Sequence, residues 1–367
     1  MDKSFYINSN YDSLNFLNQL KKKESNSFYP LKDGITEIGK RLNMGFMSYG
    51  LKILYMSGEW DNLTDETKNE YQKSFDSYQR HPYQDFKNYY IDSALMNSYK
   101  SSFSILSTKY LAKSVLSIFT KNKYESKEEN LFKAVNADNK QTISTMNELN
   151  LKYEQKFEYT FSNKTQIITY LDSLDWRFPW SAGAQFSSIC TYSNIFDLKF
   201  EDTLISYSDK LLNAETGSYH YSAVTETRQV INGAMKIITG LDWINAEIHE
   251  PKKLIDYCLN NQPYLEGCDI VDFVYVLYKC SNQDNYRRVE VSNLLKDLLN
   301  EIKELHYPEQ GGFSYYKNKS QTHYYGLKIS KGMNTPDLHG TLLCQWAINM
   351  ILDVLEILPE NIKIIKP

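Results

Sequence analysis

The chain is poor in residues that interrupt secondary structure and in residues that form covalent cross-links. Its 367 residues include only 15 glycines, 9 prolines and 5 cysteines. An odd number of cysteines, scattered through apparent helices, argues against a disulfide framework. We therefore expect reduced thiols at all five positions, Cys190, Cys258, Cys268, Cys280 and Cys344.

Long apolar runs and clusters of basic residues are also missing. No stretch approaches the roughly 18 consecutive apolar residues of a membrane-spanning helix, and residues 1–16 lack the apolar core of a signal peptide. The formal net charge is only -4, whereas sequence-independent nucleic-acid binding needs a basic surface. We expect a soluble, cytoplasmic protein that neither crosses a membrane nor binds nucleic acid.

Aromatic residues are abundant, with 30 tyrosines and 17 phenylalanines. Tyrosine offers an apolar face and a hydroxyl group on one rigid side chain, which suits the wall of a binding pocket. Such a wall fits either a sugar ring or an isoprenoid tail. Much of this aromatic inventory also fits a packed core, and composition does not choose between these two substrates.

Apolar residues recur at steps of three and four, and alternation with a period of two is scarce, so the chain is predicted to be all-α. Helix pairs at intervals of about forty residues are typical of an α/α toroid or helical solenoid. We expect a helical N-terminal part at 1–130 and a toroid portion carrying the site at 131–367. The predicted helices include 35–58, 110–119, 226–241, 251–260, 269–280, 286–305 and one that begins at Leu338.

Two loops rich in glycine and aromatic residues each lead into a predicted helix. One covers 311–337 and precedes the last helix, and the other covers 215–226. Long irregular segments inside compact domains are usually functional or disordered, and the loop at 311–337 is too aromatic to be disordered. We expect the loops to converge at one end of the helical array and to build a pocket there.

Three segments resemble parts of the terpenoid cyclases and protein prenyltransferase β-subunits. They are GGFSYY from Gly311, DLHGTLLCQWA from Asp337 and LEGCDIVDFVYVLY, which begins at residue 265. The resemblance covers roughly residue 142 to the C-terminus and implies the α/α toroid fold. Neither the tandem acidic motif of class II terpene cyclases nor the aspartate-rich motif of class I synthases is present intact.

In the prenyltransferases an Asp-x-Cys pair and a later histidine hold zinc, and the resemblance places Glu266, Cys268 and His339 at those positions. The chain departs from that pattern because glutamate replaces aspartate and Gly340 separates His339 from the following threonine. The segment DLHGT also resembles the Cys-His-Gly zinc segment of the lanthionine cyclases, without its cysteine. The resemblance thus implies a zinc ion as the cofactor to test.

The segment from Cys268 to Asp272 opens a predicted helix and places these two residues on one face. Asp272 lies in an otherwise apolar helix, where a carboxyl group would have a raised pKa and could serve as a general acid. Asp269 is explained by the helix dipole alone. Asp337 is a natural N-cap for the last helix, and His339 follows it either as a polar end residue or as a metal ligand.

The remaining candidates lie on loops. Residues of the long loop form a recognition or catalytic lid in which His323 or Tyr324 acts as acid or base, or else an exposed polar loop. An earlier aromatic group, with Trp176, Trp180 and Gln185, either closes the end of the helical bundle or stacks on substrate. The predicted catalytic residues are Asp272, His323, Tyr324 and His339, and the predicted substrate contacts are Trp176, Trp180, Gln185, His220, Tyr221, Gln321, Tyr325, Lys331 and Asp337.

Three functions remain open. The first is a toroid enzyme acting on an isoprenoid or a related diphosphate. The second is a glycan-active hydrolase or lyase, in which tryptophans stack on sugars and a carboxyl group acts as the acid. The third is a helical module without catalytic activity that binds a partner on its aromatic concave face.

Overall fold

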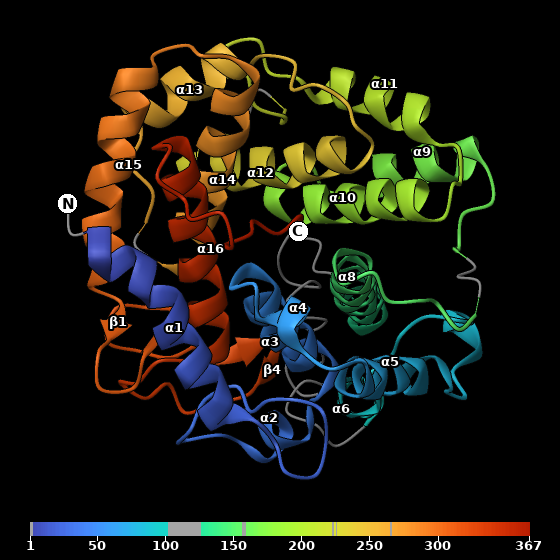
Figure 1. Cartoon of the computed structure of the whole chain (residues 1–367). Helices are drawn as coiled ribbons and strands as arrows, with labels where there is room; N and C mark the ends of the chain where they lie inside the picture. Colours follow the sequence, from blue (N-terminus) through green and yellow to red (C-terminus); the bar gives the residue numbers. More distant parts are fainter. Residues whose placement is uncertain (1–2, 102–125, 156–158, 222–223, 225, 265) are drawn as a thin grey trace, which may run out of the picture.

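The computed structural model describes residues 3–101, 126–155, 159–221, 224, 226–264 and 266–367. The helix predicted at 110–119 lies outside these residues. Within them the regular secondary structure is almost entirely helical, as predicted from the periodicity (Figure 1). None of the described helices combines the length and the apolarity that a membrane crossing requires.

The elements follow one another along the chain in a simple order. The helices are α1 (Lys3–Leu20), α2 (Glu37–Arg41), α3 (Met44–Met56), α4 (Glu59–Asn62), α5 (Asp65–Gln79), α6 (Ser93–Lys100), α8 (Lys127–Glu148), α9 (Lys164–Ser173), α10 (Pro179–Ile195), α11 (Glu201–Leu211), α12 (Thr227–Trp243), α13 (Pro251–Asn260), α14 (Gly267–Gln283), α15 (Arg288–Lys303) and α16 (Leu338–Val354), with a 3₁₀ turn at Gln84–Phe86. Two antiparallel pairs of very short strands, β1 (His306–Tyr307) with β2 (Gly312–Phe313) and β3 (His323–Tyr324) with β4 (Leu327–Lys328), shape the loop before α16.

Six helices contact one another in cyclic order. Helix α3 packs on α8, α8 on α10, α10 on α12, α12 on α14, α14 on α16, and α16 returns to α3. Five other helices lie against this set: α1 and α15 on α16, α13 on α14, and α9 and α11 on α10 (Figure 1). The chain therefore alternates between helices of the cyclic set and helices that cover them.

Several neighbours in the cyclic set run in the same direction, because their contacts advance together along both helices. The pairs are Ser48–Thr142 and Lys52–Ser144 for α3 and α8, Trp180–Gln229 and Phe186–Gly240 for α10 and α12, Asn232–Asp269 and Lys236–Asp272 for α12 and α14, and Gly267–Leu343 and Tyr275–Trp346 for α14 and α16. The first turns of these helices consequently lie toward one end of the set, beside the loops that precede them.

Helices from both sides of residue 130 pack together. Both α1 and α3 contact α16, and the backbone of Ile35 forms an isolated β-bridge with Ser330 in the loop before α16. Helices of the N-terminal part therefore enclose the same interior as helices of the C-terminal part.

The single helix predicted at 35–58 is in fact two, α2 and α3. The chain turns at Leu42 and Asn43, and the carboxylate of Asp92 accepts hydrogen bonds from the backbone N–H groups of Asn43 and Met44, at 2.7 and 3.0 Å. This distant carboxylate satisfies donors that a continuous helix would have used internally. The predicted end of α3 is confirmed, since Gly58 follows it in the left-handed conformation.

Helix α16 is the most deeply buried element, because almost every residue from Leu338 to Val354 is inaccessible to solvent. A helix that is apolar all round packs against other elements on every side. Its predicted N-cap is confirmed, as the side chain of Asp337 accepts a hydrogen bond from the backbone of Gly340. This start places His339 in the first turn, facing the neighbouring helices α3 and α14.

Candidate functional site

The loop before α16 is held by one buried carboxylate. Asp337 is 1 % exposed, and its oxygens accept the backbone N–H groups of Tyr315, Gln321 and Gly340 at 2.8, 2.9 and 2.8 Å. Burial raises the pKa of Asp337 to about 6, and these backbone hydrogen bonds act against that rise. We call these four residues the loop hub. Asp337 and Gln321, predicted as substrate contacts, therefore position the loop.

Gly340 has a steric role in the same place. A Cβ atom there would lie 2.4 Å from the backbone nitrogen of Tyr315 and 2.5 Å from the carbonyl carbon of Ser314. The loop backbone therefore crosses directly over the first turn of α16, and only glycine leaves room for it. This crossing brings Tyr315 next to His339.

A group of polar and aromatic side chains gathers inside the cyclic set. We call it the interior cluster; it consists of Tyr49 from α3, Lys236 from α12, Cys268 and Asp272 from α14, Tyr315 from the loop, and His339 from α16. Three of the predicted site residues, Cys268, Asp272 and His339, thus come together.

His339 lies between two tyrosine rings. It stacks on Tyr49 with ring centroids 4.6 Å apart and an angle of 11° between the planes, and Tyr315 lies tilted against it at 5.2 Å. Burial, and then the nearby charge of Lys236, lower the pKa of His339 to about 3, so its imidazole is neutral. Its Nδ1 atom is buried and has no hydrogen-bond partner among the described residues.

Asp272 is the carboxyl group of the interior cluster. It is 1 % exposed, and its Oδ1 lies 3.4 Å from Nζ of Lys236. Its Oδ2 is buried without a hydrogen-bond partner among the described residues. Burial raises the pKa of Asp272 to about 6 despite the opposing charge of Lys236, and the nearby Asp269 adds to the rise. Asp272 can therefore hold or release a proton close to neutral pH.

Cys268 is a neutral thiol in this setting. Burial, and then the charge of Asp272, raise the pKa of Cys268 to about 12, and its side chain forms a hydrogen bond with Tyr315. A thiol with so high a pKa is a poor nucleophile at neutral pH. Its predicted metal-binding neighbour Glu266 lies 3.3 Å from Arg228 instead. The described residues contain no group of three or more His, Cys, Asp and Glu that could hold a metal ion, so they do not fit the zinc centre implied by the resemblance.

A second carboxyl group, Asp138 on α8, lies close to the interior cluster. Tyr324 donates a hydrogen bond from its hydroxyl to Oδ1 of Asp138, and its ring packs edge-on against Tyr49 at 6.1 Å. Burial raises the pKa of Asp138 to about 7, against the lowering effect of the Tyr324 hydrogen bond. Gly45 makes this contact feasible, because a Cβ atom there would collide with the Tyr324 hydroxyl.

Several of these side chains keep accessible surface deep inside the protein. Cys268, His339 and Lys140 of α8 are partly accessible, although burial is the main cause of their pKa shifts. Lys236 is 25 % exposed, and Tyr325 is partly accessible as well. These partly accessible side chains come from α8, α12, α14, α16 and the loop before α16.

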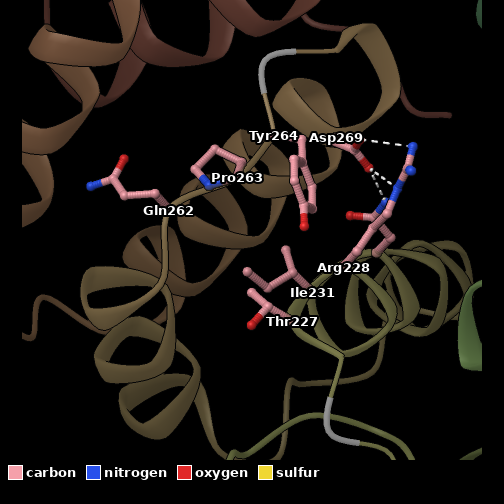
Figure 2. Close-up of a pocket in the computed structure, with 8 residues that line it drawn as sticks. Thr227, Arg228, Ile231, Gln262, Pro263, Tyr264 and Asp269 are labelled. Atoms are coloured by element: carbon pink, nitrogen blue, oxygen red, sulfur yellow. Dashed lines mark hydrogen bonds and ion pairs between the residues drawn. The ribbon is translucent and has the colours of Figure 1, made fainter.

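The region near the starts of α12 and α14 differs from the interior cluster in how its charges are paired. Figure 2 shows Arg228 beside Asp269, with Tyr264 standing over a small pocket that Thr227, Ile231, Gln262 and Pro263 also line. The carboxylate of Asp269 accepts hydrogen bonds from Arg228 Nε at 2.9 Å and Asn232 at 2.6 Å. Arg228 also lies over the ring of the predicted substrate contact Trp180, at 5.1 Å. The charges of Arg228 and Asp269 are thus paired with each other.

The earlier aromatic group does not reach the interior cluster through its described contacts. Trp176 is 1 % exposed and donates its Nε1–H to the carbonyl of Leu171 at 2.8 Å, so it closes the end of α9. Gln185 accepts a hydrogen bond from Tyr170 at 3.0 Å. His220 lies 2.8 Å from the carbonyl oxygen of Tyr221 and 3.1 Å from the hydroxyl of Thr216. These contacts give Trp176, Gln185 and His220 structural roles.

Three other predicted site residues lie at the surface. His323 is exposed, with its Nδ1 atom 2.9 Å from the Thr322 hydroxyl, and Lys331 is exposed as well. Tyr221 is 49 % exposed. Neighbouring residues of a strand point to opposite faces, so the hairpin that turns Tyr324 inward turns His323 outward. The structure therefore does not place His323 beside Asp272 and His339.

The sequence did not single out Tyr49, Asp138, Lys140 or Tyr315 as site residues. Asp138 carried a detectable signal, because it shares a helix face with Ala134, Val135 and Thr142, all of which are buried. A carboxylate on the buried face of a helix is unusual unless it has a structural or functional partner. Tyr49 lies in an apolar helix and carried no such signal.

No protein-family model, curated protein or solved structure matches the chain.

Proposed function

We propose that this chain is an enzyme built as an α/α toroid that performs acid–base chemistry on a carbohydrate bound inside the ring, as a hydrolase or lyase. The cyclic order of six helices, the parallel course of neighbours and the outer covering helices support the toroid. In such an arrangement the first turns of the inner helices and the loops before them surround one opening. The interior cluster lies beside those turns.

The observation that carries the proposal is a pair of buried polar atoms with no hydrogen-bond partner among the described residues. They are Oδ2 of Asp272 and Nδ1 of His339, both in the interior cluster. A buried unsatisfied polar atom costs about 1–3 kcal/mol, so such atoms are uncommon in folded proteins. Their occurrence together, beside accessible surface, is explained if a polar ligand supplies the missing hydrogen bonds.

Two carboxyl groups can supply acid–base chemistry. Burial raises the pKa of Asp272 to about 6 and that of Asp138 to about 7. A general acid or base works best when its pKa is close to the working pH. One carboxyl group can therefore protonate a leaving oxygen while the other removes a proton from water or from the sugar, as in carboxylate-based glycosidases. Tyr324 orients Asp138 through its hydrogen bond.

The polarity of the interior favours a hydroxylated substrate over a hydrocarbon. The side chains of the interior cluster end in hydroxyl, amine, thiol, carboxyl and imidazole groups, and the tyrosine rings offer flat faces for a sugar ring. A carbocation near Asp272 would be repelled by the ammonium group of Lys236, which lies 3.4 Å from Oδ1.

An isoprenoid diphosphate is the second candidate substrate. The observation in its favour is the set of tyrosine rings around His339, together with lysines in the same interior that could bind phosphate groups. The third prediction, a binding module without catalysis, is retained as the outcome in which no substrate is turned over.

The test is a turnover screen of the full chain. Neutral and uronate-containing oligosaccharides are assayed for new reducing ends and for the ultraviolet absorbance of unsaturated sugars, with geranyl and farnesyl diphosphate in parallel. We expect activity on a carbohydrate that falls at least ~100-fold in Asp272→Asn and in Asp138→Asn, which keep side-chain shape but cannot exchange a proton.

The matched control is Asp175→Asn, which removes an exposed carboxylate that accepts hydrogen bonds from Arg177. It should retain full activity. Turnover of a prenyl diphosphate would replace the carbohydrate proposal with the isoprenoid one. Carbohydrate turnover that survives both interior substitutions would refute the assigned roles of Asp272 and Asp138.

A further inference from the structure

Lys140 is the interior charge that the proposed chemistry leaves unexplained. It lies on α8, two residues after Asp138, and its side chain is partly accessible. Among the described residues, no acceptor lies within hydrogen-bond or ion-pair distance of its Nζ. A lysine ammonium group that is removed from bulk water without an anion is strongly destabilised.

The groups that face Lys140 make its position more unusual. Lys52 of α3 and Lys236 of α12 are close enough for their charges to lower the pKa of Lys140, and the thiol of Cys190 on α10 is also close enough to affect it. Burial raises the pKa of Cys190 well above its usual value, so this thiol is neutral and offers no countercharge. Three amines therefore converge from three helices of the cyclic set.

The other two amines have partners among the described residues, and Lys140 has none there. Lys236 lies 3.4 Å from Asp272, and Lys52 lies 3.3 Å from the Ser144 hydroxyl, with Glu148 nearby. Burial, together with the charges of Lys52 and Lys236, holds the pKa of Lys140 well below its usual value. Without a bound anion, its amine therefore holds a proton less tightly than an exposed lysine does.

We propose that Lys140, together with Lys236, binds an oxoanion of the ligand inside the ring, either a carboxylate or a phosphate ester, and that Lys140 takes up a proton as the anion binds. The bound oxoanion supplies the countercharge that the described residues around Lys140 lack. Two ammonium groups then make charge-assisted hydrogen bonds to it in a desolvated site, where such bonds are strong.

This inference deepens the proposed function by giving the carbohydrate an acidic group, and it rests on that function only for the substrate class. Binding of the anion requires no turnover. A protein that turns over a neutral sugar but does not distinguish acidic from neutral sugars would refute the inference alone. A protein that binds the acidic sugars tightly but turns nothing over would refute the proposed function alone.

The experiment is isothermal titration calorimetry of the full chain with glucuronate, glucose 6-phosphate and neutral glucose. Each titration is run in two buffers that differ in ionisation enthalpy, so that proton uptake appears as a buffer-dependent heat. We expect at least one acidic sugar to bind on the order of 30-fold or more tightly than glucose, with net uptake of a proton. The two acidic probes distinguish a carboxylate site from a phosphate site.

Three variants identify the residue responsible. Lys140→Gln should lose the preference for the acidic sugar and the proton uptake, whereas Lys140→Arg should keep the preference without taking up a proton, because arginine is always charged. The control Lys164→Gln removes an exposed lysine at the start of α9 and should change neither. Circular dichroism of each variant verifies the fold.

Equal binding of all three sugars, or a preference for the acidic sugar that survives Lys140→Gln, would overturn the inference. Binding of the anion without buffer-dependent proton uptake would overturn the protonation of Lys140. A second measurement is independent of affinity: a small acylating reagent at neutral pH should label Lys140 faster than Lys164, because only a neutral amine reacts, and saturating acidic sugar should reverse the order.

Discussion

Two buried aspartates show how differently this fold uses the same chemical group. Asp337 in the loop hub and Asp272 in the interior cluster are both about 1 % exposed, and burial raises the pKa of each to about 6. Asp337 accepts three backbone hydrogen bonds from the loop and the first turn of α16. Asp272 faces one lysine and leaves its Oδ2 without a partner among the described residues.

The difference separates a structural carboxylate from one that is available to a ligand. The carboxylate oxygens of Asp337 accept hydrogen bonds from the backbone around them, and removing the carboxylate would leave these backbone donors unsatisfied. The Oδ2 of Asp272, which is unpaired among the described residues, lowers the stability of the fold, because a buried polar atom there has lost its hydrogen bonds to water. Position in the sequence and degree of burial alone would not have distinguished the two residues.

The largest expected effect is the loss of the loop hub. Asp337→Ala leaves the backbone N–H groups of Tyr315, Gln321 and Gly340 buried without an acceptor. We expect the free energy of unfolding to fall by roughly 3–9 kcal/mol, at about 1–3 kcal/mol for each of the three orphaned donors. Urea denaturation followed by tryptophan fluorescence measures the shift. Asp337→Asn keeps one acceptor oxygen and should lose less; equal stability of Asp337→Ala and the native chain would contradict the assignment.

The next effect depends on pH. Because burial raises the pKa of Asp138 to about 7, ionisation of this group destabilises the fold. The stability contributed by the protonated form is present at low pH and is lost as pH rises toward about 7. A rise from 3.8 to about 7 corresponds to ~4 kcal/mol, at about 1.4 kcal/mol for each tenfold change in the proton equilibrium. Asp138→Asn should therefore gain stability relative to the native chain as pH rises from about 4 to 8.

Denaturation curves of both proteins across this range provide the measurement. Asp175→Asn should show no such gain, because the pKa of Asp175 is lowered by its hydrogen bonds with Arg177. A constant difference between Asp138→Asn and the native chain at every pH would show that Asp138 is ionised at no cost.

A smaller effect is expected at Gly45. Its substitution by alanine would push the Tyr324 hydroxyl away from Asp138, because the added methyl group would occupy the same space. We expect a loss of about 1–3 kcal/mol, as for other overpacked cores. If the collision is the cause, Gly45→Ala combined with Tyr324→Phe should recover part of the stability in thermal unfolding. No recovery would mean that the glycine is required for another reason.

The smallest effect is expected at His339. Replacement by phenylalanine keeps a ring between Tyr49 and Tyr315 and removes the unpartnered Nδ1 atom. We expect a change in unfolding free energy within about 1 kcal/mol, while His339→Ala, which also empties the space between the rings, should cost about 2–4 kcal/mol. If His339→Phe is as unstable as His339→Ala, the imidazole has a structural hydrogen-bonding role.

The parts of the fold that could be predicted were those with local signals. Helix α13 begins and ends at the predicted residues because Pro251 is favoured in the first turn and apolar residues recur at helical spacing. Asp337 was predicted as an N-cap for the same kind of reason. The predicted helix at 35–58 was wrong at its middle, because Asp92, some fifty residues away, caps the start of α3.

The candidate site was predictable only in part, since most of its contacts are not local. Cys268 and His339 lie in first turns of helices and Asp272 lies in the turn after Cys268, where a motif in the sequence could suggest them. Asp138 and Tyr324 are separated by 186 positions, and nothing in either segment indicates the other. Because side chains alternate between the two faces of a strand, His323 and Tyr324 must point in opposite directions, but the alternation does not tell which of them points inward.

The most direct test of the account compares Asp272→Asn with Asp337→Asn in the same denaturation and turnover assays. Because the pKa of Asp272 is raised despite the neighbouring Lys236, the neutral amide should fit there at least as well as the carboxylate. The account predicts that Asp272→Asn unfolds at the native midpoint or above it and loses at least ~100-fold in turnover. It predicts the opposite pattern for Asp337→Asn, a lower midpoint with turnover retained in the molecules that remain folded. A lower midpoint with unchanged turnover in Asp272→Asn would contradict it and make Asp272 a structural residue like Asp337.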